Sequence, residues 1–346
     1  MLLEHHLDAL LVTRPVNIRY FSGFTGTDGA LIVTANETIF LTDSRYSTQA
    51  TEEVSADQHR EYAVQAEGIV AALDECCARR VGFEAEDLTC AALERLRARS
   101  GQRIEWCGLD RPMLMVRGIK DENEIAALER AAHLAAAAFD EILPLLRPGI
   151  AENEIALALE FAMRHHGGDE KSFELIVASG VRGALPHGAA SDRFLQSGEF
   201  VTIDFGLRLD GYCSDETVTL ALGKIDSESE RVYDTVYQAQ QQALSAIRPG
   251  VPLKEIDAVA RNYISAAGYG PFFGHGLGHG VGLEVHEYPT LSPRSLDTAQ
   301  VGMVFTVEPG IYLPGKGGVR LEDTVVVTVD GCRRLTCIPK GLRRLC

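Results

Sequence analysis

Acidic residues stand in strand-like runs of the C-terminal half of the chain, where carboxylates are unusual. The runs VTIDFG, FTVEPG and VRLEDTVVV contain Asp204, Glu308 and Glu322, and Asp215 directly precedes the run ETVTLAL. A buried carboxylate is costly unless a cation, hydrogen bonds or a metal ion compensates its charge. Each acid alone has a simpler interpretation, as a cap for nearby backbone groups or as part of a turn. Their joint occurrence on similar strands favours one shared site.

A histidine-rich segment, HGLGHGVGLEVHE, follows between residues 275 and 287. Neutral imidazole is the commonest metal ligand, and glycine lets a backbone approach a ligand closely. Taken alone, the segment is better explained as a glycine-rich turn with surface-exposed histidines. Added to the acids, His279 gives a set of four carboxylates and one imidazole, which is too rich in oxygen for a typical structural zinc site. The charge of about −4 on these carboxylates matches two divalent cations.

The elements that must hold these residues show an internal repeat. The segments FDEILPLLRPGIAENEIALALEFAMRHHG and YQAQQQALSAIRPGVPLKEIDAVARNYISAAG each predict a helix that ends at Arg-Pro-Gly and a second helix soon after. Pro148 and Pro249 lie 249 − 148 = 101 residues apart, and strand-like runs follow each helical pair. We expect two similar α/β halves with a site in the cleft between them. Chance similarity of two helical hairpins is the alternative.

The N-terminal part reads as a separate α/β unit. Residues 8–43 contain short β-branched runs divided by turn residues, which predict strands and turns. Helices are expected around RYSTQATEE and DLTCAALERLRARS, with the strand RVGFEA between them. Asp121, Glu122 and Glu124 suit the positive end of a long alanine-rich helix. The 346 residues exceed the usual size of a single core, so we predict an α/β (α+β) chain with domains at 1–115 and 116–346.

Composition excludes several classes of protein. Apolar residues make up 46% of the chain and charged residues 24%, values typical of a soluble globular protein. The net charge of −16 argues against nucleic acid or an anionic membrane as a partner. The start MLLEHHLDALLVTRP resembles no secretory signal, and no run is long enough to span a bilayer, so a cytoplasmic location is expected. The eight cysteines show no paired C-x-x-C spacing and are expected to be reduced, with Cys213 a small buried residue rather than a nucleophile.

Five blocks of the sequence carry a family resemblance. The blocks ALPHG, VTIDFGLRLDGYCSDET, GHGLGHGVGLEVHEYP, MVFTVEPGIY and GVRLEDTVVV resemble, in this order, the signatures of the Xaa-Pro peptidase branch (aminopeptidase P and prolidase) of the pita-bread M24 metallopeptidases. NIRYFSGFTGTDGALIV and LTDSRYSTQA resemble the creatinase-like first domain of that family. The resemblance covers nearly the whole chain. It implies a catalytic pita-bread domain with an internal pseudo-twofold repeat.

The resemblance also implies a set of site residues. Two divalent ions, manganese, cobalt or zinc with manganese favoured, would be held by five residues: Asp204, Asp215, His279, Glu308 and Glu322. His187 and His286 match catalytic residues that act beside Glu308, and His275 matches a residue of the substrate pocket. Arg320 is predicted to bind the substrate carboxylate or, equally, to pair with a neighbouring acid. One position departs from the family pattern, because many relatives carry arginine where this chain has Val218.

The implied reaction is hydrolysis of the bond between an N-terminal residue and proline by metal-activated hydroxide. Glu308 would assist proton transfer, while His286 and His187 would stabilise the oxyanion or the leaving nitrogen. Peptides with proline second are the expected substrates, and a homodimer is expected. Dipeptidase and aminopeptidase activity both stay open. A methionine-aminopeptidase-like hydrolase and a non-catalytic binding protein on the same fold are the alternatives, whereas the full ligand set argues against a metal-free creatinase-like hydrolase.

Overall fold

The structure, a computed structural model, describes residues 1–110 and 112–345. The chain divides into two units, Met1–Val116 and Arg117–Cys346. Within the described residues, every helix is too short or too polar to cross a bilayer.

The N-terminal unit is built on a six-stranded sheet with the strand order β4-β3-β2-β1-β5-β6. The β1–β2 and β2–β3 pairs are antiparallel and the other pairs are parallel. The strands are β1 (Ala9–Val12), β2 (Ala30–Thr34), β3 (Thr38–Thr42), β4 (Gln58–Glu61), β5 (Arg80–Glu84) and β6 (Glu105–Leu109). The helices are α1 (Pro15–Ser22), α2 (Ser47–Glu53), α3 (Gln65–Glu75), α4 (Cys90–Ser100) and, at the unit boundary, α5 (Pro112–Gly118).

The predicted strand RVGFEA and the two predicted helices of this unit are confirmed as β5, α2 and α4. Helix α1 is a miss, because residues 8–43 were predicted to hold strands and turns only. Its N-terminal backbone is capped by Glu84, which accepts hydrogen bonds from the N–H groups of Thr13 and Arg14. That cap lies about 70 residues away in sequence, so local propensity does not reveal the helix.

The C-terminal unit contains two halves that each begin with a pair of helices. The first half comprises α6 (Glu122–Ile142), η1 (Leu143–Leu145), α7 (Glu152–His165), β7 (Glu170–Lys171), β8 (Ile176–Ser179), η2 (Gly180–Ala184), β9 (Glu199–Phe205), β10 (Leu207–Leu209), β11 (Tyr212–Cys213) and β12 (Glu216–Leu222). Helix α6 is the predicted alanine-rich helix, and Asp121 and Glu124 form its capping box. The acidic residues at its start therefore act as predicted.

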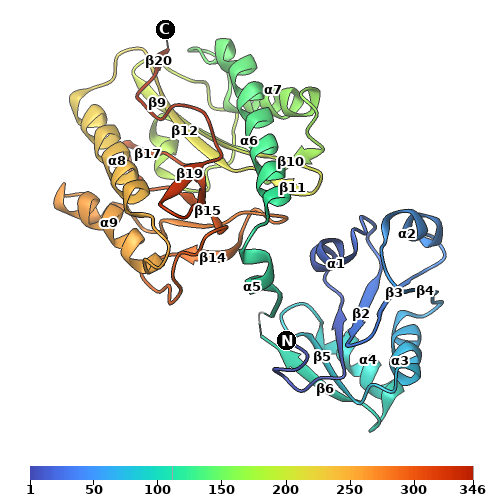
Figure 1. Cartoon of the computed structure of the whole chain (residues 1–346). Coiled ribbons are helices and arrows are strands. Elements are labelled where there is room, and N and C mark those ends of the chain that lie inside the picture. The colour runs from blue at the N-terminus through green and yellow to red at the C-terminus, as the bar shows by residue number, and fades with distance from the viewer. Residues whose placement is uncertain (111, 346) are drawn as a thin grey trace. The chain divides into compact units, whose positions relative to one another are not determined.

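The second half comprises α8 (Ser227–Ala246), α9 (Leu253–Ala266), η3 (Gly270–Phe272), β13 (Gly278–Gly280), β14 (Glu287–Leu291), β15 (Val304–Val307), β16 (Gly310–Leu313), β17 (Gly317–Arg320), β18 (Asp323–Val327) and β19 (Cys332–Arg334). The last strand, β20 (Arg344–Leu345), returns to the first half and pairs with β12. The two main sheets have the orders β20-β12-β9-β8 and β14-β13-β15-β18-β19. Figure 1 shows α6 and α7 flanking the strands on one side and α8 and α9 on the other.

The predicted repeat is confirmed by equivalent contacts in the two halves. Gly149 and Gly250 follow the two Arg-Pro turns with φ of +91° and +85°. Their N–H groups donate to the carbonyls of Leu195 and Ala299 at 2.9 and 2.8 Å. A bridge to the loop before a strand then precedes each second helix, Ala151 with Phe194 and Pro252 with Thr298. The halves are thus similar in structure as well as in sequence.

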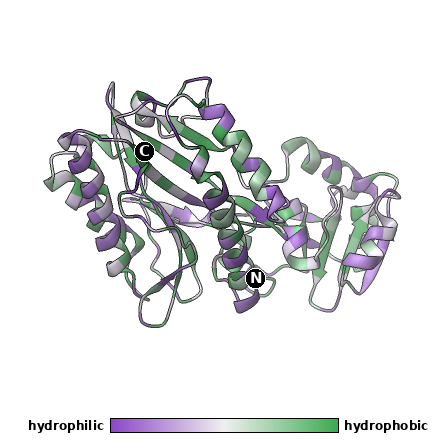
Figure 2. Cartoon of the chain, turned by 90° about the horizontal axis from the view of Figure 1, so that it is seen from above, coloured by the Kyte–Doolittle hydropathy of each residue, from purple (hydrophilic) through white to green (hydrophobic). Residues whose placement is uncertain are grey.

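Each main sheet has one face packed against a pair of helices, and the opposite face of the first sheet is polar. Asp204 lies opposite Thr217 in the β9–β12 pair, and Thr202 lies opposite Thr219 on the same face. The alternate residues pack in the core with α6 and α7, and the corresponding residues of β15 and β18 pack with α8 and α9. Figure 2 shows the hydrophobic colour concentrated on the central strands of this unit. The opposite face of β15 and β18 carries Thr306 and Thr324, together with Val304 and Val326, which pack in an apolar cluster with Leu128 of α6.

Candidate metal centre

Three predicted ligands from separate parts of the chain meet in the C-terminal unit. Asp215 precedes β12, His279 is in β13, and Glu322 lies between β17 and β18. One potential ligand atom from each lies within 4.8 Å of the other two. The Nε2 atom of His279 is 3.6 Å from an oxygen of Asp215. These residues form the only such group of three acids, histidines or cysteines among the residues that the structure describes.

The other two predicted ligands adjoin this group. The Oε1 atom of Glu308 lies 3.2 Å from Nε2 of His279 and accepts a hydrogen bond from Thr306 at 3.1 Å. Asp204 forms an ion pair with Arg320, with 2.6 Å between Oδ2 and Nη2. The second carboxylate oxygen of Asp204 is buried and has no partner within the described part of the chain. All five residues predicted as ligands are thus gathered in one region.

The electrostatics of this region show carboxylates that lack enough positive charge. Burial raises the pKa of Asp204, and burial together with the charges of the neighbouring acids raises the pKa values of Asp215 and Glu322 well above their usual range. Glu308 behaves differently. Burial alone would raise its pKa, but the hydrogen bond and charge of His279 prevail and lower it to about 2. Burial alone would lower the pKa of His279. The hydrogen bond and charge of Glu308 outweigh burial, so the pKa of His279 is raised.

The glycines around His279 are explained by close approach of the neighbouring strands. A Cβ atom at position 278 would overlap the carbonyl oxygen of Thr306, and one at position 280 would overlap the carbonyl of Tyr288. Strand β13 lies between β14 and β15, and its register shifts between His279 and Gly280. The strands on either side leave no room for side chains at positions 278 and 280. Glycine at both positions therefore lets His279 lie on a central strand.

Two further histidines stand beside the group. The rings of His286 and His279 have centroids 4.2 Å apart. Burial lowers the pKa of His286, and the charges of His279 and His187 lower it further. Both His286 and His187 are exposed, so a ligand can reach them. The loop before His187 is tied to the site, because the carbonyl of Pro186 accepts a hydrogen bond from Arg320 at 3.1 Å.

His275 and Arg320 are engaged by protein groups. His275 has Nε2 2.9 Å from the hydroxyl of Tyr312 and Nδ1 2.8 Å from the carbonyl of Gly276. The Arg320 guanidinium donates to Asp204, Pro186, Tyr312 and Thr217. These contacts favour the second of the two predicted roles of Arg320, an ion pair with a neighbouring acid. A direct contact of either residue with substrate stays a prediction.

Comparison with known proteins agrees with this geometry. Residues 126–329 match the metallopeptidase family M24, and residues 1–119 match the creatinase/prolidase N-terminal domain. The chain belongs to metallopeptidase family M24. A curated Xaa-Pro dipeptidase from Pyrococcus horikoshii is 36% identical over 340 residues, which cover 96% of this chain and 93% of that protein.

Two solved structures resemble this M24 chain closely. An Xaa-Pro dipeptidase from Bacillus anthracis has a TM-score of 0.96 and 40% identity, covering 99% of this chain and 96% of that one. An X-Pro aminopeptidase from Thermotoga maritima MSB8 has a TM-score of 0.92 and 37% identity, covering 98% of each chain. The expectation of a small creatinase-like domain followed by a pita-bread domain is confirmed.

Three site residues of the M24 chain were not predicted from sequence. The hydroxyl of Thr217 donates to Glu322 at 2.6 Å and accepts from Nε of Arg320 at 3.2 Å. Tyr312 joins His275 to Arg320, and Thr306 contacts Glu308. Thr217 carried a usable signal, because it stands two residues after Asp215 and strand alternation places it on the same face. Thr306 carried the same signal, because it stands two residues before Glu308. Tyr312 carried none, since its partners His275 and Arg320 come from other segments.

Two residues noted in the sequence lie away from the ligands. Val218 is buried in the core on the opposite face of β12 from Thr217, near Phe139 of α6. At the position where many relatives carry arginine, this chain therefore has an apolar core residue. Cys213 is fully buried with Sγ near the carbonyl of Leu283, which agrees with the expected small buried residue.

The residues present fit a pair of divalent cations. Hard cations prefer carboxylate oxygens, and several such residues with one imidazole suit manganese or a similar ion. The unpartnered oxygen of Asp204 and the raised pKa values of Asp215 and Glu322 are the features expected of a site built to hold positive charge.

Proposed function

We propose that this chain is a metal-dependent Xaa-Pro peptidase, which hydrolyses the bond between an N-terminal residue and proline. The observation that carries the proposal is the meeting of Asp215, His279 and Glu322 within 4.8 Å, with Glu308 3.2 Å from His279. Asp204, with one free buried oxygen, completes the ligand set. Two divalent ions are proposed, with manganese favoured. Family membership and the names of the relatives support the same reaction class.

The chemistry divides between the metals and the protein side chains. Bound divalent ions supply a nucleophile at neutral pH and polarise the scissile carbonyl. Glu308 assists proton transfer, because its carboxylate is ionised and lies 3.2 Å from His279 among the proposed ligands. His286 and His187 donate hydrogen bonds to the developing oxyanion or to the leaving imino nitrogen. Their exposure beside the buried ligands suits that role.

Proline in second place does not by itself decide how long the peptide substrate is. Solved relatives with names of both kinds, an Xaa-Pro dipeptidase and an X-Pro aminopeptidase, resemble this chain to a similar degree. Peptide length therefore has to be measured. A cytoplasmic location, a homodimer and a boundary between domains near residue 115 complete the proposal.

The test is hydrolysis of Ala-Pro and Ala-Pro-Ala by the metal-stripped protein, before and after addition of Mn²⁺. Cleavage that returns only with metal is the expected result. Cleavage of Ala-Pro alone identifies a dipeptidase, and cleavage of the longer peptide identifies an aminopeptidase. The variant His279→Ala is the inactive control, and Lys316→Met is the matched surface control because Lys316 only pairs with Glu228 on the surface.

Two outcomes contradict the proposal. Cleavage of Met-Ala-Ser in place of both proline peptides supports the methionine-aminopeptidase alternative. Binding of Mn²⁺ with cleavage of none of the three peptides supports a non-catalytic binding protein.

A further inference from the structure

The last described part of the chain, residues 335–345, joins the two main sheets and is called the C-terminal strap here. It leaves β19, the edge strand of the second sheet, and ends in β20, which pairs in parallel with β12 of the first sheet. At its start the N–H of Leu335 donates to the carbonyl of Thr324, next to β19. Near its end the carbonyl of Arg343 accepts from Ala221 of β12. The strap is thus fastened to both halves.

One lysine of the strap is buried between acids from the two halves. The Nζ atom of Lys340 contacts Oε1 of Glu216, the first residue of β12, and lies 3.7 Å from Oδ1 of Asp323, the first residue of β18. The side chains of all three residues are at most 3% exposed. A buried charge survives only when it is paired, so this lysine neutralises acids that would otherwise repel each other.

These two acids are sequence neighbours of proposed ligands. Glu216 follows Asp215, and Asp323 follows Glu322. Because side chains alternate along a strand, the ligands face the metal centre while their neighbours face the opposite side. The same two strand ends are joined by the N–H of Glu322, which donates to the carbonyl of Thr217 at 3.1 Å. Any change in the spacing of these strand ends therefore moves the two ligands relative to each other.

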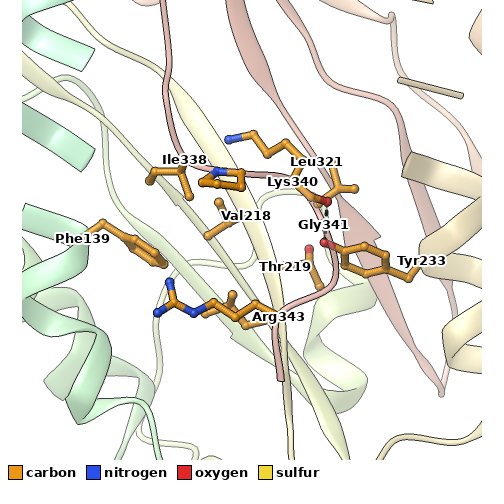
Figure 3. Close-up of a pocket in the computed structure, with 11 residues that line it drawn as sticks. Phe139, Val218, Thr219, Tyr233, Leu321, Ile338, Lys340, Gly341 and Arg343 are labelled. Atoms are coloured by element: carbon orange, nitrogen blue, oxygen red, sulfur yellow. Dashed lines mark hydrogen bonds between the residues drawn. The ribbon is translucent and has the colours of Figure 1, made fainter. Parts of the chain in front are cut away.

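The strap is held in place by several other contacts. Figure 3 shows Tyr233 of α8 bonded to the backbone carbonyl of Lys340, at 2.9 Å, with the Lys340 side chain directed away from that bond. The hydroxyl of Thr336 donates to Asp323 at 2.8 Å, and the N–H of Ile338 donates to Glu216 at 3.2 Å. Lys340 therefore sits on a fixed backbone.

We propose that Lys340 is a positioning residue for the metal centre, which ties β12 to β18 from behind and so sets the spacing of Asp215 and Glu322. The inference rests on the metal centre of the proposed function, and it assigns to the strap a role in metal affinity. Lys340 does not touch the ligands. Its effect passes through Glu216 and Asp323, whose backbones are continuous with the ligand residues.

The experiment compares Lys340→Met and the double variant Lys340→Met/Glu216→Gln with the wild-type chain. The double variant removes one positive and one negative charge, so it avoids an unpaired buried acid and protects against a simple failure to fold. Lys316→Met is the matched control, since Lys316 is 60% exposed and lies 2.7 Å from Glu228. Binding of Mn²⁺ alone to metal-free protein is measured by calorimetry, well below the melting temperature of each variant. The visible spectrum of the Co²⁺-loaded protein reports the ligand geometry.

The expected result is a loss of Mn²⁺ affinity of about 10-fold or more in both Lys340 variants, with altered Co²⁺ bands, and no change in Lys316→Met. Native affinity and an unchanged Co²⁺ spectrum in a folded double variant would overturn the inference, even if its melting temperature fell. Failure of both variants to fold would make the cluster a determinant of folding and would also overturn the positioning role. Wild-type protein that binds two Mn²⁺ ions but cleaves no proline peptide refutes the proposed activity and leaves this inference standing.

Discussion

The two faces of the β12 and β18 strand ends carry the same kinds of residue in opposite electrostatic conditions. On the inner face, Asp215 and Glu322 stand with other acids, and burial and mutual repulsion raise their pKa values well above the usual range. On the outer face, Glu216 and Asp323 share Lys340. Asp323 also accepts from Gln240 and pairs with Arg334 at 3.1 Å. The outer acids are paired with cations of the chain, although the second carboxylate oxygen of Glu216 is buried without a partner among the described residues, whereas the inner acids are short of positive charge.

This difference separates the acids that are proposed to bind metal from the acids that pair within the protein. Burial of an acid is costly on either face: even beside Lys340, burial raises the pKa of Glu216 to about 7. On the outer face the protein offsets that cost with its own lysine and hydrogen bonds. On the inner face Arg320 neutralises Asp204, and the remaining negative charge is available to bind cations.

The largest effects are expected when one acid on each face is neutralised by substitution. Glu322→Gln is expected to lower peptidase activity by more than about 100-fold, because a metal ligand is lost. It is also expected to raise the melting temperature of the metal-free protein, because it relieves repulsion. Asp323→Asn is expected to lower that melting temperature, with a loss of about 3 kcal/mol in unfolding free energy, because Lys340 and Arg334 lose a buried partner.

Calorimetric melting of metal-free protein and a peptide assay with Mn²⁺ check both variants. Equal destabilisation by the two substitutions would contradict the contrast between the faces. So would a metal-free Glu322→Gln protein that melts below the wild type.

A smaller effect is expected at Thr217, which supports the inner face from the same strand. Thr217→Val keeps the shape of the side chain but removes the hydrogen bonds to Glu322 and Arg320. We expect Mn²⁺ affinity to fall by about 10-fold, as is common for residues that orient metal ligands. Thr217→Ser retains the hydroxyl and should restore most of the affinity. If the valine and serine variants bind Mn²⁺ equally well, the hydroxyl has no orienting role.

The sequence predicted the inner face better than the outer one. Asp204, Asp215, Glu308 and Glu322 were recognisable because acids in β-branched runs are costly, and the repeat of helical pairs predicted two halves. Glu216 and Asp323 stand in the same runs, yet nothing local distinguishes them as acids paired with a lysine. The pairing depends on the path of residues 335–345 from β19 to β20, which only the fold reveals.

The same reason explains the other differences. Helix α1 was missed because Glu84, on a distant strand, caps its start. Arg320 was given two equal roles, since sequence does not show that Asp204 lies 2.6 Å away. Local patterns predict residue types and strand faces, but partners from other strands need the three-dimensional structure.

The smallest expected effect is a pH dependence of folding stability that arises from the residues of the inner face. The pKa values of Asp204, Asp215 and Glu322 are raised in the folded protein, so the folded state holds their protons more tightly than the unfolded state does. Stability then falls as the pH rises above the ordinary carboxyl range of about 4. The raised pKa of His279 acts in the same direction, because its contribution is full below about pH 6.5 and is lost as the pH rises through its folded pKa. The lowered pKa of Glu308 opposes this only below its ordinary value of 4.5, and the lowered pKa values of His275 and His286 oppose it only below about pH 6.5.

Between about pH 6.5 and pH 8 the metal-free protein should therefore melt at progressively lower temperature, by a few degrees for each kcal/mol lost. Saturating Mn²⁺ should reduce or reverse the trend, because metal ions replace the protons on the same oxygens. Because the raised pKa of Glu216, about 7, also falls in this range, the inner face is read from the difference between the metal-free and Mn²⁺-loaded melting curves. Glu322→Gln should make the metal-free curve shallower. Parallel metal-free and metal-loaded curves across this range would mean that the inner carboxylates are already compensated by the protein, as the outer ones are.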